Sequence, residues 1–145
     1  MKTENNIPEC LRMSRNQSSV VVNEWQGPAV RALFVCSAGI LRSPTAAIHF
    51  ATTQGWNTRA VGINHNFALI PVSEALMNWA DVIFVMTPDQ RLDLKLRFGD
   101  GFSDKIFCLH IEDDFGFMDS QLVQFLEASM KEVMETDEFK KAAFG

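Results

Sequence analysis

The feature that most constrains the fold is a regular alternation of short apolar runs and helical patterns that begins at residue 30. Strand-length apolar runs lie at 30–36, 58–63, 81–86 and 105–111, and a helical pattern follows each of them. Strands that alternate with helices across short connections form a parallel sheet covered on both faces. We therefore predict an α/β fold, a doubly wound four-stranded parallel sheet with helices on both faces.

Residue types typical of helix ends support this division. Ser43 followed by Pro44 is predicted to cap the first helix, Ser73 the second, and Asp119 the last. In the last helix, apolar residues recur close to helical spacing, which predicts one buried stripe formed by Leu122, Phe125, Leu126, Met130, Val133 and Met134.

The chain is predicted to hold one domain, residues 30–145. A total of 145 residues, 47% of them apolar, suffices for one core and is short for two. Residues 1–29 are polar and lack a sustained period, so we predict an extension outside the core. It is either a partly disordered tail or an arm, carrying Trp25, that covers a pocket or binds a partner of unknown identity.

Charge and cysteine usage exclude several classes of protein. The net charge of -5 argues against nucleic-acid binding, and no apolar run reaches the roughly 20 residues of a membrane span. The polar N-terminal residues do not fit a signal peptide. Three cysteines without metal-ligand spacing favour free thiols in a reducing cytoplasm. We expect a cytoplasmic protein without metal, cofactor, nucleic-acid partner or membrane partner.

Cys36 and Arg42 stand at the two ends of the segment CSAGILR, where the first strand passes into its helix. Ligands of open parallel sheets bind at the carboxyl ends of the strands. Loop amides over a helix N-terminus can receive a tetrahedral dianion, and a guanidinium can clamp two of its oxygens. The same groups would favour a thiolate on Cys36, which is a nucleophile for phosphorus.

A plainer interpretation is that Cys36 is a small apolar residue at the end of a strand and Arg42 a solvated helix residue. The Cys-x5-Arg spacing alone does not exclude it. Gly39, which adopts positive φ at little cost, the preceding strand and the following Ser-Pro favour a catalytic loop.

The segment VCSAGILRSP, residues 35–44, resembles the signature of the low-molecular-weight protein tyrosine phosphatases, a strand followed by Cys-x5-Arg-Ser-Pro. The resemblance continues through most of residues 30–130, including the acidic segment IEDDFGFMD, and is strongest to compact bacterial and phage members. It implies a two-step phosphoryl transfer through a cysteinyl-phosphate, without a metal.

The resemblance also implies a role for each site residue. Cys36 would attack phosphorus, Ser43 would hydrogen-bond the thiolate, and the phosphoryl oxygens would bind Ser37, Ala38, Gly39, Ile40, Leu41 and Arg42. The family places its general acid in the late acidic loop, so Asp113 is the favoured acid and Asp114 the alternative. Asp114, Phe115 and Phe117 are candidates for the substrate pocket. Leu41 replaces a second loop cysteine of the family, so reversible disulfide protection is not expected.

The predicted function is that of a cysteine-dependent phosphomonoester hydrolase, first of all a protein tyrosine phosphatase acting on a phosphorylated protein. One alternative is a phosphatase for a small or nucleotide phosphomonoester. Another is a phosphate- or phosphoprotein-binding module with little turnover. Arsenate reduction on the same fold needs further cysteines, and none follows Cys108.

Overall fold

The computed structural model describes residues 29–37, 42–64, 70–111 and 118–145, and the predicted extension therefore lies almost wholly outside the described residues. The described strands are β1 (Arg31–Cys36), β2 (Asn57–Gly62), β3 (Val82–Val85) and β4 (Ile106–Cys108). The described helices are α2 (Arg42–Gln54), α3 (Glu74–Trp79), α4 (Pro88–Phe98), α5 (Ser120–Met134), α6 (Asp137–Phe144) and the 3-10 helix η2 (Asp100–Lys105).

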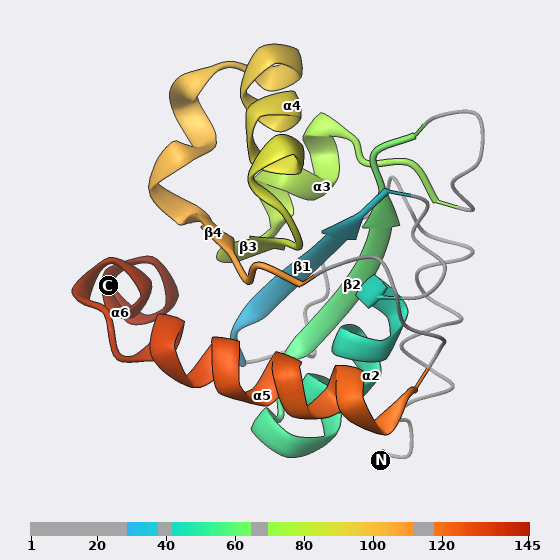
Figure 1. The fold of residues 1–145 in the computed structure, drawn as a ribbon. Helices are drawn as coiled ribbons and strands as arrows, with labels where there is room; N and C mark the ends of the chain where they lie inside the picture. The colour runs from blue at the N-terminus through green and yellow to red at the C-terminus, as the bar shows by residue number, and fades with distance from the viewer. Residues whose placement is uncertain (1–28, 38–41, 65–69, 112–117) are drawn as a thin grey trace.

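The four strands form one sheet in the order β2-β1-β3-β4, and every neighbouring pair is parallel. In β1, Val35 pairs with Val61 of β2 on one side and with Val85 of β3 on the other. The continuous apolar runs in the sequence arise because side chains on both faces of these strands are buried. The prediction of a four-stranded parallel sheet is confirmed (Figure 1).

Helices cover both faces of the sheet, as predicted (Figure 1). On one face, α2, α5 and α6 pack over a core rich in aromatic rings. On the other face, α3 and α4 contribute Leu76, Met77, Trp79 and Leu94 to a mainly aliphatic core. The two cores lie on opposite sides of β1, so this strand is fixed from both faces and both edges.

Phe84 of β3 is the centre of the aromatic core, and its replacement by alanine should weaken the fold strongly. Its buried ring lies 5.1 Å from Phe34, 6.0 Å from Trp56 and 6.2 Å from Phe139, measured between ring centroids. We expect Phe84→Ala to lower the free energy of unfolding by about 3–5 kcal/mol. Phe144→Ala is the matched control, since that ring is 70% exposed and should cost less than about 1 kcal/mol. Urea unfolding followed by circular dichroism measures both, and equal losses would contradict this assignment of the core.

Three sequence expectations differ from the structure. Ser43 is not the helix cap, because α2 is described from Arg42 and the Ser43 hydroxyl bonds to Cys36 and Val61 instead. Phe125 is 53% exposed and does not belong to the buried stripe. The fourth strand is only three residues long, since Lys105 ends η2.

The predicted caps of two other helices are confirmed. The Ser73 hydroxyl accepts from the Leu76 N–H at 3.3 Å, and the Asp119 carboxylate accepts from the Gln121 N–H at 2.8 Å. The final helix α6 was not predicted, and it begins after Thr136, whose hydroxyl accepts from the Phe139 N–H. In the part of the chain that the structure describes, no helix is both long and apolar enough to cross a membrane.

Candidate active site

Cys36 ends β1, a central strand, and its backbone is fixed by the neighbouring strand. The Ile63 N–H donates to the Cys36 carbonyl at 2.9 Å, and the Asn64 N–H donates to the Ser37 carbonyl at 2.8 Å. The pairing of the two chain segments thus continues beyond the last residue of each strand. The thiol therefore stands at the carboxyl edge of the sheet, where ligands of this fold class bind.

The Cys36 thiol contacts the hydroxyl of Ser43 in the first turn of α2. The distance between Sγ and Oγ is 3.1 Å, and the same Oγ lies 3.3 Å from the Val61 carbonyl oxygen. A hydroxyl carries one proton, so these two contacts describe two protonation states. A neutral thiol donates to Ser43, which donates to Val61; a thiolate requires Ser43 to turn its proton toward sulfur. The geometry accommodates both forms of Cys36 without movement of a heavy atom.

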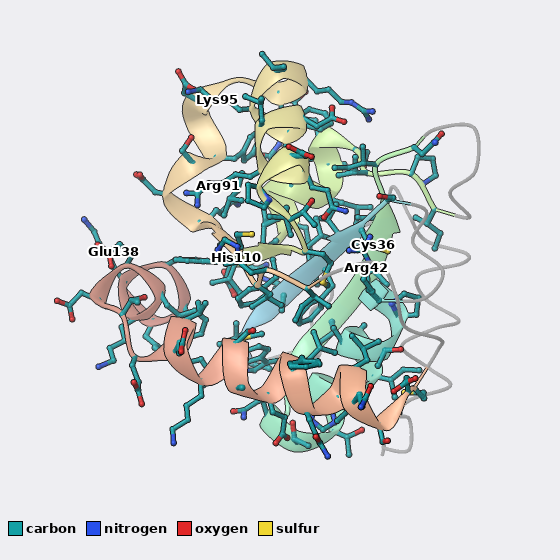
Figure 2. All side chains as sticks on the ribbon, in the orientation of Figure 1. Cys36, Arg42, Arg91, Lys95, His110 and Glu138 are labelled. Carbon is teal, nitrogen blue, oxygen red and sulfur yellow. The ribbon has the colours of Figure 1, made fainter. Side chains whose placement is uncertain are left out.

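Arg42 precedes Ser43 in the first turn of α2 and is buried, with an exposed fraction of 2%. One guanidinium nitrogen, Nη1, donates to the Ile111 carbonyl oxygen at 2.8 Å. Figure 2 labels Cys36 and Arg42 in the region of the carboxyl end of β1. A guanidinium carries five N–H donors in a planar fork, a geometry that matches the oxygens of a phosphoryl group.

The first turn of α2 concentrates buried polar side chains. Arg42, Ser43 and Thr45 are all buried, and each makes a hydrogen bond to a segment distant in the sequence. Burying a polar group costs free energy unless the group is hydrogen-bonded. A cluster of buried, hydrogen-bonded polar side chains therefore indicates a functional site more than it indicates ordinary core packing. Thr45 was not singled out from the sequence, because nothing in the local pattern marks it as polar and buried.

The segments on either side of the predicted acidic loop are held against the same region. The Ile111 N–H donates to the Met86 carbonyl at 2.7 Å, and the Met118 N–H donates to the Thr45 hydroxyl at 2.8 Å. Among the described residues, the non-glycine residues with positive φ are His110 and Met118, both at 58°. That conformation is costly for side chains other than glycine, and it persists only where contacts enforce it.

Gln90 of α4 reaches Ser37, the first residue of the predicted phosphate-binding segment. Its Nε2 lies 3.4 Å from Ser37 Oγ, while its Oε1 accepts from the Met86 N–H at 2.8 Å. The buried amide therefore links the end of β3 to Ser37. Sequence reasoning missed this residue, because the link joins segments that are more than fifty residues apart.

The structure brings together four of the predicted site residues: Cys36, Ser37, Arg42 and Ser43. The other predicted residues lie outside the described residues; they are Ala38, Gly39, Ile40, Leu41, Asp113, Asp114, Phe115 and Phe117. Within the described ranges, no three His, Cys, Asp or Glu side chains gather in a way that could hold a metal ion. A surface cavity of about 390 Å³ lined by residues of α2, α5 and α6 contains none of the site residues.

The second described thiol, Cys108, differs from Cys36 in its surroundings. It lies half-buried at the end of β4. Burial raises the pKa of the Cys108 thiol, although a hydrogen bond with the His110 backbone and the positive charge of Arg91 oppose the shift. Near neutral pH, Cys108 therefore stays a protonated thiol, which is a poor nucleophile.

Comparison with solved structures defines the class of fold. Similar structures include the YwlE arginine phosphatase from Geobacillus stearothermophilus, at 20% identity over 73% of this chain and 94% of that chain, with a TM-score of 0.58. The tyrosine phosphatase Wzb from Escherichia coli K30, in complex with phosphate, is 17% identical over 72% of this chain and 96% of its own, with a TM-score of 0.57.

A low-molecular-weight protein tyrosine phosphatase from Bacillus subtilis is 23% identical over 74% of this chain and 99% of its own, with a TM-score of 0.52. No protein-family model matches the sequence, and no curated protein matches it. At these identities the likeness concerns the fold. The chain has the fold of the low-molecular-weight protein tyrosine phosphatases, as the sequence resemblance predicted.

Proposed function

We propose that the protein is a cysteine-dependent phosphomonoester hydrolase that acts through a cysteinyl-phosphate. The observation that carries the proposal is the contact of the buried Cys36 thiol with Ser43 Oγ at 3.1 Å, in the helical turn that also holds the buried Arg42. A sulfur nucleophile with a hydroxyl in hydrogen-bond reach, and a buried guanidinium in the same turn that could bind phosphoryl oxygens, are the parts that this reaction needs. The phosphatase fold around these residues supports the same reaction.

In the proposed first step, Cys36 Sγ attacks phosphorus and the bond from phosphorus to the leaving oxygen breaks. The acid protonates that oxygen as it departs, while Arg42 and the loop amides hold the phosphoryl oxygens. In the second step, water attacks phosphorus, the acid's carboxylate takes the water proton, and the bond between sulfur and phosphorus breaks. Ser43 stabilises the thiolate that this step regenerates.

Asp113 is the proposed acid and base, with Asp114 as the alternative. Asp113 is two residues beyond Ile111, whose carbonyl accepts from Arg42 at 2.8 Å. Two residues of fully extended chain span at most about 7 Å, so the Asp113 backbone cannot lie far from that carbonyl. This constraint on chain length favours a carboxylate close to the proposed anion clamp.

A phosphotyrosine-bearing protein is the proposed first substrate class, and a small or nucleotide phosphomonoester the second. The solved relatives include both tyrosine phosphatases and an arginine phosphatase, so the fold leaves the choice open. Phe115 and Phe117 would favour an aromatic leaving group if they line the pocket, because aromatic rings stack on one another.

The experiment that tests this function uses Asp113→Ala and an activated aryl phosphate, such as 2,4-dinitrophenyl phosphate. Its phenolate leaves without a proton, so the first step should proceed, while the second step lacks its base. We expect a burst of phenolate close to one equivalent of enzyme, followed by turnover about 10²–10⁴-fold slower than that of the unaltered protein. Mass spectrometry after acid quench should find the phosphoryl group on Cys36.

Asp114→Ala is the matched control, because it removes the neighbouring carboxylate and should leave rapid turnover without a burst. The reverse pattern would assign the acid to Asp114. If the unaltered protein turns over no aryl phosphate, or if the phosphoryl group is never found on Cys36, the proposed function is wrong.

A further inference from the structure

The first turn of α2 holds the chain on both sides of the acidic loop. Arg42 donates to the Ile111 carbonyl at 2.8 Å, and three residues later Thr45 accepts from the Met118 N–H at 2.8 Å. Residues three apart lie on the same face of a helix, about 4.5 Å apart along its axis. Ile111 and Met118, the described residues on either side of the acidic segment, are therefore both held by one helical turn, the turn that also carries Ser43.

Arg42 and Thr45, the two residues that make these bonds, differ in their place in the proposed mechanism. Arg42 belongs to the proposed anion clamp, whereas the proposed mechanism gives no role to Thr45. Thr45 is buried, and its hydroxyl is held by the bond from the Met118 N–H. Its hydroxyl is therefore a buried acceptor for Met118, the first described residue after the segment that carries Asp113 and Asp114.

The partner of Thr45 is an unusual backbone position. Met118 has a φ of 58°, and His110 on the other side of the loop has the same value. Such conformations cost free energy in residues other than glycine and cluster where a functional segment is held in one arrangement. Loss of the Thr45 acceptor should let Met118 relax toward ordinary backbone angles, and the end of the loop should move with it.

From these contacts we propose that Thr45 is a positioning residue for proton transfer, which holds the acidic loop so that its carboxylate meets the leaving oxygen. This inference rests on the proposed function. It predicts that loss of the Thr45 hydroxyl lowers kcat/KM most for substrates whose leaving oxygen must be protonated. A residue that only stabilises the fold would slow all substrates alike.

The test compares kcat/KM for two aryl phosphates, because this quantity reports the step in which the phenol leaves. Phenyl phosphate needs a proton on its leaving oxygen, and 2,4-dinitrophenyl phosphate does not. We expect Thr45→Val, which keeps the shape and removes the hydroxyl, to lower kcat/KM for phenyl phosphate at least about tenfold and for the dinitrophenyl ester less than threefold. Thr45→Ser, which restores an acceptor, should return most of the loss.

Thr58→Val is the matched control. Thr58 is also buried and also bonds to α2, through a 2.8 Å hydrogen bond from its hydroxyl to the Ala47 carbonyl, but it lies in β2 and this partner lies beyond the first turn of the helix. We expect its effect to be the same for both esters. Inhibition by inorganic phosphate should be unchanged within about twofold in Thr45→Val, since Cys36, Arg42 and the loop between them are intact.

Hydrogen exchange of the Met118 amide gives a readout independent of activity. We expect this amide to exchange at least about tenfold faster in Thr45→Val than in the unaltered protein, and unchanged in Thr58→Val. An equal loss for both esters, or an unchanged Met118 amide, would overturn the role of Thr45 while leaving the proposed function intact. Failure of the unaltered protein to hydrolyse either ester would overturn the proposed function, and this inference with it.

Discussion

Replacement of Cys36 by serine is expected to lower kcat/KM for phenyl phosphate by at least about 10⁴-fold, or about 5 kcal/mol of transition-state stabilisation. The reason lies in the contact with Ser43, whose hydroxyl lies 3.1 Å from Sγ and can donate its single proton to a thiolate. One such donor is enough to stabilise a thiolate at this position. It is not enough to stabilise an alkoxide, because a serine hydroxyl ionises far less readily than a thiol. The serine side chain is close in size, so the buried position should still fold.

Cys108→Ser is the matched control for this variant. It makes the same atomic change at a half-buried thiol whose pKa is raised by burial, and it should leave kcat/KM within about twofold of the unaltered protein. A Cys36→Ser protein that keeps more than a tenth of the activity would rule out the cysteinyl-phosphate. An unaltered protein that binds inorganic phosphate but hydrolyses no aryl phosphate would instead identify a binding module.

The parallel sheet could be predicted from the sequence because its strands are buried on both faces, which makes each one a continuous apolar run. The runs at 30–36 and 81–86 correspond to β1 and β3, with ends that differ by one residue. Phe125 shows where such pattern reading fails. Successive residues of a helix are rotated by about 100° around its axis. By this rotation Phe125 lies about 100° away from the centre of the buried face formed by Leu122, Leu126 and Met130, and its side chain is exposed.

The candidate site could be predicted only where its residues are close in the sequence. Cys36, Arg42 and Ser43 lie within eight positions, so their spacing, together with the preceding strand and the glycine between them, favours an anion-binding loop. The bond from Arg42 to Ile111 spans 69 positions and the bond from Met118 to Thr45 spans 73, so both depend on the completed fold. The local pattern predicts Ser43 as a helix cap because capping is a local function, whereas its partners in the structure come from β1 and β2.

The second large effect is expected at Arg42, where replacement by lysine should lower kcat/KM for phenyl phosphate by about 10³-fold. Lysine keeps the charge but not the planar fork, and an ammonium cannot hold two phosphoryl oxygens in the plane of a guanidinium. It should also lose the 2.8 Å bond from Nη1 to Ile111, which fixes the start of the acidic loop. Both the anion clamp and the placement of the acid are therefore expected to weaken together, and inhibition by inorganic phosphate should weaken at least about tenfold.

Arg59→Lys separates these effects from the general cost of removing a buried guanidinium. Arg59 is as buried as Arg42, at 2% exposed, but it lies in β2 and stacks over the Trp79 ring at 4.8 Å, on the opposite face of the sheet. Both lysine variants should lower the melting temperature, since each disturbs a buried cation. Only Arg42→Lys should weaken inhibition by phosphate. Equal losses of phosphate inhibition in the two variants would show that Arg42 contributes through stability alone, because a clamp on the phosphoryl oxygens has no counterpart at Arg59.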